Sequence, residues 1–406
     1  MRSFRALRPA SQQAAARVLA PPYDVVDSAE ASALAAGNPL SLLHVTRPEI
    51  DLPTGADPSG PQAHAGAKAA LAALVESGTL VRDDAERFLA YRLVRAGRVQ
   101  TGVVGCAAVA DYLNGVIAVH ERTRTDKEAD RVAHIDAVDA HDEAVLLMYR
   151  PDGPGAVAIA EVLARTTAGE PWYDVTDDDG VRHIVWPVDR ADTPLLAGAF
   201  AALAHLYVAD GHHRSAAAAL VASRRGGSGA STLFPVVAFP AGELTVLPYH
   251  RVVRDLAGLD EQAFLDAVGE AFVVEPSATA VEPAQAWTYG IRLLSGWYRA
   301  RLRADPAAGD LLSRLDAAVL ADRVLAPLLG ITDPRTDPRI AFVGGSRGTA
   351  ELDRLVDGGA AAVAFSMPAT TPDQVMSVAD AGLVMPPKST WFSPKLASGL
   401  FLHPLH

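Results

Sequence analysis

Cysteine is almost absent from this chain of 406 residues, and the one that is present is Cys106. A single cysteine cannot form an intramolecular disulfide, so a small disulfide-stapled scaffold is excluded. Cys106 lies in an apolar, strand-like run, which predicts a small, buried hydrophobic side chain. A reducing cytoplasm is the simplest location for such a chain.

Long apolar runs are also missing. None approaches the ~20 residues that a membrane-spanning helix needs, so we expect no membrane partner. Residues 1–9 carry three arginines with no apolar segment after them, which argues against a signal peptide. Half of the residues are hydrophobic, and a chain of this length can bury a large core in roughly two or three domains.

The chain lacks a positive charge balance. It has 48 acidic and 36 basic residues, for a net charge of −12. Proteins that bind duplex nucleic acid need a basic face, so nucleic acid is not an expected partner. A local basic pocket for a small anion is compatible with this balance. An acidic surface with clustered arginine, lysine and histidine favours an enzyme that handles phosphate.

Lysine is rare, because arginine supplies all but four of the 36 basic residues. A lysine binds phosphate as a compact, movable point charge, whereas arginine is a planar fork. A retained lysine therefore suggests a position that needs an ammonium group, with chance retention on a solvated surface as the alternative. Lys388 and Lys395 lie close together in the stretch 385–395, which favours a shared role.

Several catalytic motifs are missing. The sequence has no His-Glu-x-x-His, no Cys/His zinc pattern and no Gly-x-Ser-x-Gly elbow. Lys388-Ser389-Thr390 resembles the end of a P-loop, but the upstream glycines of that motif are absent. Pro386-Pro387 cannot offer the N–H groups that cradle a phosphate in that loop. A Walker-type ATPase is therefore excluded.

Turn and capping signals divide the chain into strands and helices in mixed order. Strands are predicted at 88–94, 99–112, 116–120, 144–150, 204–209, 233–239 and 361–365. Helices are predicted at 63–78, 125–140 and 371–382, and from the turn at Gly211 to Gly226. Asn114-Gly115 predicts a hairpin turn, and Thr125 with Glu128 predicts a capping box.

This mixture of hairpins with strand–helix units predicts an α+β, or mixed α/β, fold with mixed sheets. We expect three regions. Residues 1–253 form an α/β region that holds a phosphate-binding strand-turn-helix. Residues 254–360 form a mainly helical subdomain, because 256–330 have a helical pattern. Residues 361–406 form a strand, a helix and a loop that return to the active site.

The residues Asp210-Gly211-His212-His213-Arg214 form the sharpest candidate site. A strand ends, the chain turns at Gly211, and a helix begins. The turn exposes backbone N–H groups at the positive end of the helix dipole. Two histidines and an arginine add donors, and Asp210 can hold a metal or accept a proton. The alternative is a plain helix cap with solvated histidines.

A second candidate, His120-Glu121-Arg122-Thr123-Arg124, lies between a strand and a capped helix, where functional loop residues often gather. Part of the following helix is alternatively a charged, solvated face. His134 and His141 have helical spacing and are expected on the surface. A third candidate combines Lys388, Ser389, Thr390 and Lys395, with a structural C-terminal tail as the alternative.

Several of these segments carry a resemblance to a known family. The chain resembles the bacterial and archaeal family called domain of unknown function 1015, nearly end to end. The resemblance is carried by residues 4–9, 21–26, 38–39, 44–51, 120–131, 210–214 and 385–400. Residues 210–214 also resemble the phosphate-binding Gly-x-x-Arg box of ParB-like proteins, some of which are kinases of free L-serine. The arginine box and the helix-turn-helix of DNA-binding ParB proteins are not found.

The resemblance implies a small-molecule kinase that makes O-phosphoserine from L-serine with pyrophosphate, ATP or ADP. Mg²⁺ is the expected cofactor, and Asp210 its expected ligand. The residues expected to act in catalysis are Asp210, Glu121, His213 and Lys388. Those expected to bind the donor are Gly211, His212, Arg214, Arg122, Arg124, Ser389, Thr390 and Lys395. Those expected to bind the amino acid are Tyr23, Asp24, Asn38, Arg47 and His120.

Two other functions stay open. A ParB-like regulatory protein would bind a nucleotide tightly and make no phosphorylated product. A metal-dependent phosphohydrolase would use a cluster of acidic and histidine ligands, namely His120, Glu121, Asp210, His212 and His213.

Overall fold

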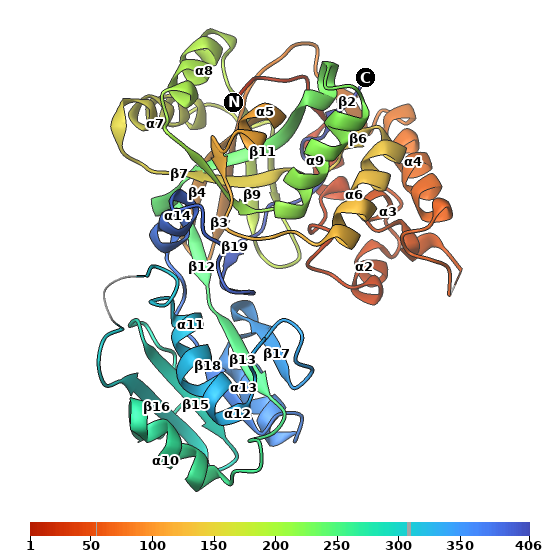
Figure 1. Ribbon diagram of the computed structural model, residues 1–406. Coiled ribbons are helices and arrows are strands. Elements are labelled where there is room, and N and C mark those ends of the chain that lie inside the picture. Colours follow the sequence, from red (N-terminus) through yellow and green to blue (C-terminus); the bar gives the residue numbers. More distant parts are fainter. Residues whose placement is uncertain (54, 307–309) are drawn as a thin grey trace. The chain divides into compact units, whose positions relative to one another are not determined.

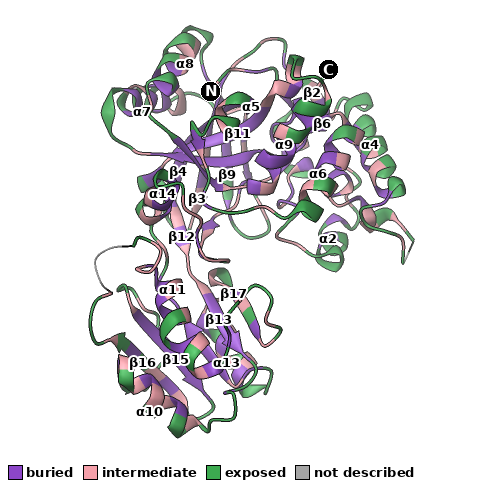
Figure 2. Cartoon of the chain, in the orientation of Figure 1, coloured by how far each residue is buried: buried purple, intermediate pink, exposed green. Residues whose placement is uncertain are grey.

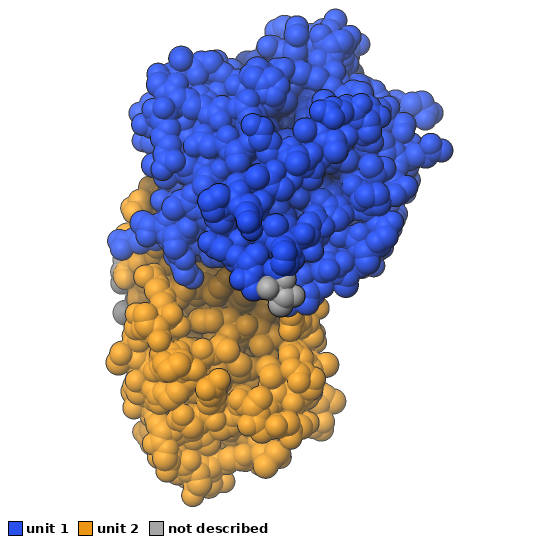
Figure 3. All heavy atoms as spheres, turned by 90° about the vertical axis from the view of Figure 1, so that its right-hand side faces the viewer, with its two compact units in different colours: residues 1–244, 394–406 blue, residues 245–393 orange. Residues whose placement is uncertain are grey.

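The structure is a computed structural model that describes residues 1–53, 55–306 and 310–406 (Figure 1). The fold is mixed α/β, as the sequence predicted. Buried residues gather on the strands (Figure 2). The chain forms two compact units, shown in different colours in Figure 3. Unit 1 comprises residues 1–244 and 394–406, and unit 2 comprises residues 245–393. No helix in the described segments is both long enough and apolar enough to span a membrane.

A mixed sheet of eight strands organises the described part of unit 1. The strand order is β5 (Ile117–Ala118), β10 (Leu206–Asp210), β7 (Val145–Tyr149), β11 (Leu233–Pro240), β4 (Arg98–Ala108), β3 (Leu89–Arg95), β9 (Arg182–Pro187) and β8 (Tyr173–Thr176). The pairs β10–β5 and β11–β7 are parallel, and β10 runs antiparallel to β7. All five residues of β7 are buried, which is the pattern of a central strand. Cys106 is fully buried in β4, as expected.

Helices cover this sheet and form an adjoining layer. They are α1 (Gln12–Val18), α2 (Ser28–Ala35), α3 (Leu43–Thr46), α4 (Pro61–Glu76), α5 (Val109–Leu113), α6 (Thr125–Val138), α7 (Gly153–Thr167), α8 (Thr193–Ala201) and α9 (His212–Arg224). Helix α7 packs with α8, while α6 packs with both α4 and α9 (Figure 1). Helices α1 to α4 share a core of small and branched apolar residues with the short strands β1 (Leu7–Pro9) and β2 (Leu80–Arg82).

The C-terminal tail of unit 1 pairs with three segments distant in sequence. Ser398 bridges Ala20, and Leu402 bridges Leu7. Strand β20 (His403–Pro404) pairs with β6 (Ala140–His141). Tail residues such as Lys395 are therefore fixed against the main body of unit 1.

The predicted hairpin at Asn114-Gly115 is wrong. Residues Val109–Leu113 form α5, Asn114 is its C-cap, and Gly115 takes a positive φ of 76°. Asn-Gly is also a helix-ending signal, because both residues tolerate the left-handed conformation. The next strand, β5, pairs in parallel with β10 and makes no hairpin with β4.

Unit 2 is built on a six-stranded sheet, within its described residues. The order is β14 (Phe272–Ser277), β16 (Gly296–Leu302), β15 (Thr288–Leu293), β18 (Val363–Ser366), β13 (Tyr249–Val253) and β17 (Ile340–Gly344). Strands β12 (Thr245–Leu247) and β19 (Trp391–Ser393) form a separate pair. The helices are α10 (Glu261–Ala271), α11 (Asp316–Leu320), α12 (Ala326–Leu329), α13 (Gly348–Asp357) and α14 (Pro372–Asp380). Helix α14 begins with the Thr371 cap and Pro372 that the sequence predicted.

The prediction of a mainly helical segment over 254–360 is wrong, because the four strands β14 to β17 lie within it. Strands β15 and β16 are joined by the two residues Leu294-Ser295. That connection has none of the Asn-Gly chemistry that marks a hairpin in a sequence. The predicted division at residues 253 and 360 also differs from the observed units, since residues 361–406 are shared between both.

Candidate active site

Three chain segments of unit 1 meet at one edge of its sheet. Strands β5 and β10 are parallel, so His120-Glu121, which follow β5, and Asp210-Gly211, at the end of β10, lie at the same edge. Strand β7 is antiparallel to β10, with Leu146 opposite Asp210, so Glu143 reaches this edge just before β7 begins. The carboxyl ends of parallel strands are where ligands commonly bind in α/β sheets.

Gly211 makes the turn from β10 into α9. Its φ of 98° lies in the left-handed region, which glycine adopts without strain. A Cβ at this position would also lie 3.3 Å from the Arg214 guanidinium. Gly211 is the N-cap of α9 and offers no capping side chain. The first N–H groups of α9 therefore lie beside Asp210 with the positive end of the helix dipole, an arrangement that suits an anion.

Asp210 is held between two cations. Its Oδ1 accepts a hydrogen bond from Lys395 Nζ at 2.5 Å, and its Oδ2 accepts one from Arg214 Nη2 at 2.9 Å. Burial alone would raise the pKa of Asp210, but the charges of Lys395 and Arg214 outweigh it and lower the pKa. The carboxylate is therefore ionised at neutral pH. Lys395, one of the four lysines, therefore contacts the carboxylate of the first candidate segment, and its role in donor binding stays a prediction.

Arg214 is buried among three carboxylates. Besides Asp210, its guanidinium lies 3.7 Å from Asp24 Oδ2 and 4.0 Å from Glu143 Oε2. Its Nη1 also donates to the Ala144 carbonyl. Burial alone would lower the pKa of Arg214, but the surrounding negative charges raise it. The Arg214 guanidinium is thus a permanent cation, buried beside the end of β10.

Glu143 is a site residue that the sequence analysis missed. Its Oε1 accepts hydrogen bonds from the Tyr23 backbone N–H at 2.9 Å and from Ser398 Oγ at 2.8 Å. Burial raises its pKa. Glu143 therefore joins the N-terminal segment, the C-terminal tail and Arg214. A run of three polar residues directly before a strongly apolar strand was the available signal.

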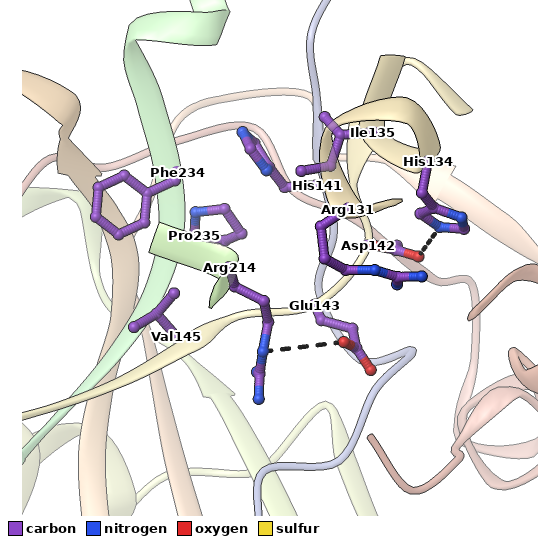
Figure 4. Close-up of a pocket in the computed structure, with 10 residues that line it drawn as sticks. All are labelled: Arg131, His134, Ile135, His141, Asp142, Glu143, Val145, Arg214, Phe234 and Pro235. Atoms are coloured by element: carbon purple, nitrogen blue, oxygen red, sulfur yellow. Dashed lines mark hydrogen bonds and ion pairs between the residues drawn. The ribbon is translucent and has the colours of Figure 1, made fainter. Parts of the chain in front are cut away.

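A pocket opens beside this carboxylate (Figure 4). It is lined by Arg131, His134, Ile135, His141, Asp142, Glu143, Val145, Arg214, Phe234 and Pro235. The Arg131 guanidinium also lies 4.0 Å from the centre of the Tyr23 ring. His134 Nε2 and Asp142 Oδ2 are 2.7 Å apart. The expectation that His134 and His141 lie on the surface is wrong, because both are buried on the inward side of α6 and β6.

Two histidines and one glutamate form a cluster at the sheet edge. The centres of the His120 and His212 rings lie 4.5 Å apart, and His212 Nδ1 is 3.9 Å from Glu121 Oε2. One ligand atom from each residue lies within 4.8 Å of the other two. Burial lowers the pKa of His120 to about 4 and also lowers that of His212. Both rings are therefore neutral at pH 7, the state in which imidazole binds a metal.

The remainder of the second candidate segment lies nearer the surface. The Arg124 backbone N–H donates to His213 Nε2 at 3.1 Å, and burial lowers the pKa of His213. The Arg124 side chain pairs with Asp126 in solvent, and Arg122 is exposed. The predicted capping box is wrong, because Arg124 is the N-cap of α6 and Glu128 bonds Thr123.

Only some of the residues predicted to bind the amino acid lie near Asp210 and Arg214. Tyr23 and Asp24 lie at the site through their contacts with Glu143 and Arg214. Arg47 supports them, since its Nη1 donates to the Tyr23 carbonyl at 3.0 Å. Asn38 makes its side-chain hydrogen bonds with Arg17 and with the Leu40 backbone, and none of these reaches Asp210 or Arg214.

Lys388, Ser389 and Thr390 belong to unit 2. Lys388 has a left-handed backbone, with a φ of 54°, and its Nζ lies 5.4 Å from the centre of the Tyr249 ring. Ser389 Oγ donates to the Pro386 carbonyl at 2.7 Å. Their roles in phosphate binding stay predictions.

The chain belongs to the family described as protein of unknown function, DUF1015, which matches residues 1–318. This confirms the resemblance drawn from the sequence motifs. No curated protein matches the chain significantly.

Solved structures show distant likenesses to the chain. A conserved hypothetical protein from Pyrococcus furiosus is 12% identical, with a TM-score of 0.35, over 73% of this chain and 94% of that one. A free serine kinase in complex with AMP is 12% identical, with a TM-score of 0.36, over 71% of this chain and 86% of that one. SbnI from Staphylococcus aureus is 10% identical, with a TM-score of 0.39, over 73% and 85%.

Proposed function

We propose that this protein is a small-molecule kinase that transfers a phosphoryl group to the hydroxyl of free L-serine. The observation that carries the proposal is the junction of β10 and α9. There an uncapped helix N-terminus lies beside Arg214, Lys395 and the ionised Asp210. Phosphoryl transfer needs mainly the positioning of the reactants and the neutralisation of charge, and this junction offers both.

The donor phosphates bind at the N-terminus of α9. The N–H groups of His212 and His213 face the anion, and the cations of Arg214 and Lys395 neutralise it. Arg122 and Arg124, on the loop that follows β5, add charge from the solvent side. This arrangement fits pyrophosphate, ATP or ADP, since all three present a terminal phosphate to such a site.

The hydroxyl proton passes to a carboxylate at the same edge. The lowered pKa of Asp210 makes it a weak base. The Glu121 side chain is half exposed, and its Oε2 lies 3.9 Å from Nδ1 of His212, the first residue of α9. We therefore assign the proton to Glu121. Of the residues proposed to bind the amino acid, Tyr23 and Asp24 contact Glu143 and Arg214, and His120 lies beside His212. The choice of L-serine rests on the resemblance of residues 210–214 to the ParB-like box.

Mg²⁺ fits this site as a partner of the donor phosphates. Magnesium prefers oxygen ligands and is commonly held by one or two carboxylates together with substrate phosphates. Asp210 and Asp24 supply such oxygens beside the N-terminus of α9. Ligation by Asp210 requires one of its cationic partners to turn to the phosphate, which the donor's negative charge favours.

Phosphorus NMR tests the proposal directly. The purified full chain with Mg²⁺ and L-serine is incubated separately with pyrophosphate, ATP and ADP. We expect an O-phosphoserine signal with one donor, and its loss in Asp210→Asn. Consumption of every active donor to free phosphate alone would refute the kinase.

A phosphohydrolase is the second candidate, and the cluster of His120, Glu121 and His212 is the observation that favours it. A hydrolase would release free phosphate at a rate independent of L-serine. The same NMR experiment therefore separates the two reactions.

A further inference from the structure

Three metal-binding side chains from two loops converge in unit 1. His120 and Glu121 follow β5, while His212 opens α9 after β10. Because β5 and β10 are parallel neighbours, their register brings these residues together. We propose that His120, Glu121 and His212 form a site for a divalent transition-metal cation of the zinc, iron or manganese class.

The geometry of the two rings supports a shared ligand. The His120 and His212 rings are nearly perpendicular, at 89°, with their centres 4.5 Å apart. A ligand atom from each of the three residues lies within 4.8 Å of the other two. Metal–ligand bonds of about 2.0–2.2 Å would draw these atoms inward by side-chain rotation alone. Both rings stand at the ends of paired strands, so the backbone already fixes their approach.

Burial gives an independent reason for a ligand. Only 6% of His212 is exposed, and its Nε2 has no hydrogen-bond partner among the described residues. A buried polar atom without a partner is destabilising, because it has lost its hydrogen bonds to water, so native structures rarely keep one. Both ring nitrogens of the buried His120 also lack a partner among the described residues, so a cation bound between His120, Glu121 and His212 would satisfy a buried ring nitrogen of this cluster.

The ligand set selects the class of metal. Two imidazoles and one carboxylate suit zinc, iron and manganese, whereas Mg²⁺ prefers a shell of oxygens. Three protein ligands leave a position open, as in catalytic zinc sites. The Glu121 side chain is 50% exposed, so a cation can reach the cluster from the solvent side.

The site has a consequence for catalysis that rests on the proposed function. Glu121 is the carboxylate to which we assign the serine proton. A bound transition metal would occupy this carboxylate, so it would no longer accept the proton. Zinc is therefore expected to inhibit the reaction that Mg²⁺ supports.

Metal titration tests the site without any substrate. The untagged full chain is stripped with a chelator and titrated with Co²⁺, whose visible absorption reports nitrogen ligands, and Zn²⁺ competition is followed by calorimetry. We expect one equivalent to bind. Since loss of an outer-shell partner alone weakens metal binding about 10–100-fold, loss of a ligand in His212→Asn or Glu121→Gln should weaken it at least about tenfold.

Matched variants make the result decisive. His205→Ala removes an exposed histidine just before β10 and should leave binding unchanged. Glu121 is half exposed, so Glu121→Gln should fold and decides the matter even if His212→Asn does not. Absence of stoichiometric binding, or equal affinity in Glu121→Gln and the unaltered chain, would overturn the site. Stoichiometric binding, together with no phosphoserine from the stripped chain supplied with Mg²⁺ and each donor, would reject the kinase and keep the site.

Discussion

Two rare lysines that lie close in sequence have different environments. Lys395, in unit 1, bonds the buried carboxylate of Asp210 at 2.5 Å. Lys388, in unit 2, lies over the Tyr249 ring, and its carbonyl accepts a hydrogen bond from Arg251 at 3.3 Å. The first lysine bonds a carboxylate next to a helix N-terminus, and the second lies over an aromatic ring at the start of β13. Rarity alone thus finds candidate lysines without saying what each contacts.

The two units also bury charge differently. In unit 1, Arg214 is surrounded by Asp24, Glu143 and Asp210, and its pKa is raised. In unit 2, Arg251 is also buried, but burial lowers its pKa to about 10 because the charge of Asp316 offsets the effect of burial only in part. Unit 1 therefore holds a stabilised cation with anionic partners at a sheet edge. Such a paired arrangement can exchange partners when an anionic ligand arrives.

The largest effect is expected for Lys395→Ala. The change removes a cation proposed to bind the donor phosphate and leaves Asp210 with Arg214 alone. Loss of one such donor typically lowers turnover by about 10²–10³-fold. Initial rates of phosphoserine formation would measure this. Lys395→Arg keeps the charge and serves as the control, with a smaller loss, and near-normal turnover in Lys395→Ala would remove the residue from the site.

Lys388→Ala sharpens the comparison between the two lysines. The sequence hypothesis gives Lys388 the task of neutralising the transferred group, and it predicts a loss of orders of magnitude in turnover with the fold intact. The same rate assay measures this, and a melting curve checks the fold. Turnover close to that of the unaltered chain would confine Lys388 to its contacts in unit 2.

Residue patterns predicted six of the eight strands in the unit 1 sheet, without β8 and β9, and did not show that β5 lies beside β10. The apolar runs before Asp210 and after Glu143 were clear, and so was the turn at Gly211. The parallel pairing of β5 with β10, which brings His120 toward His212, depends on contacts between distant segments and leaves no local signal. The polar run before β7 was the only local signal for Glu143, and its partners Tyr23 and Ser398, which make it part of the site, are far away in sequence.

Glu143→Ala is expected to destabilise unit 1 by about 3 kcal/mol or more. It leaves the buried Tyr23 N–H without an acceptor and removes a carboxylate near Arg214. Asp353→Ala is the matched change in unit 2, where the carboxylate bonds Arg292 and Trp297 but is 36% exposed. Urea unfolding should show a larger loss for Glu143→Ala. Equal losses of unfolding free energy in the two variants would mean that the deeper burial of Glu143 does not increase its contribution to stability.

The smallest effect concerns stability in acid. It is expected in both units, because each holds a buried histidine with a lowered pKa. Burial lowers the pKa of His141 in unit 1 to about 3 and that of His250 in unit 2 to about 4. Since the unfolded state takes up these protons near pH 6.5, stability should fall as the pH drops from there toward the folded pKa values. His141→Gln should flatten this fall in unfolding free energy measured from pH 7 to pH 4. An unchanged slope of unfolding free energy against pH would show that His141 does not titrate on unfolding. The slope for His250→Gln would then test whether unit 2 alone gives the acid sensitivity.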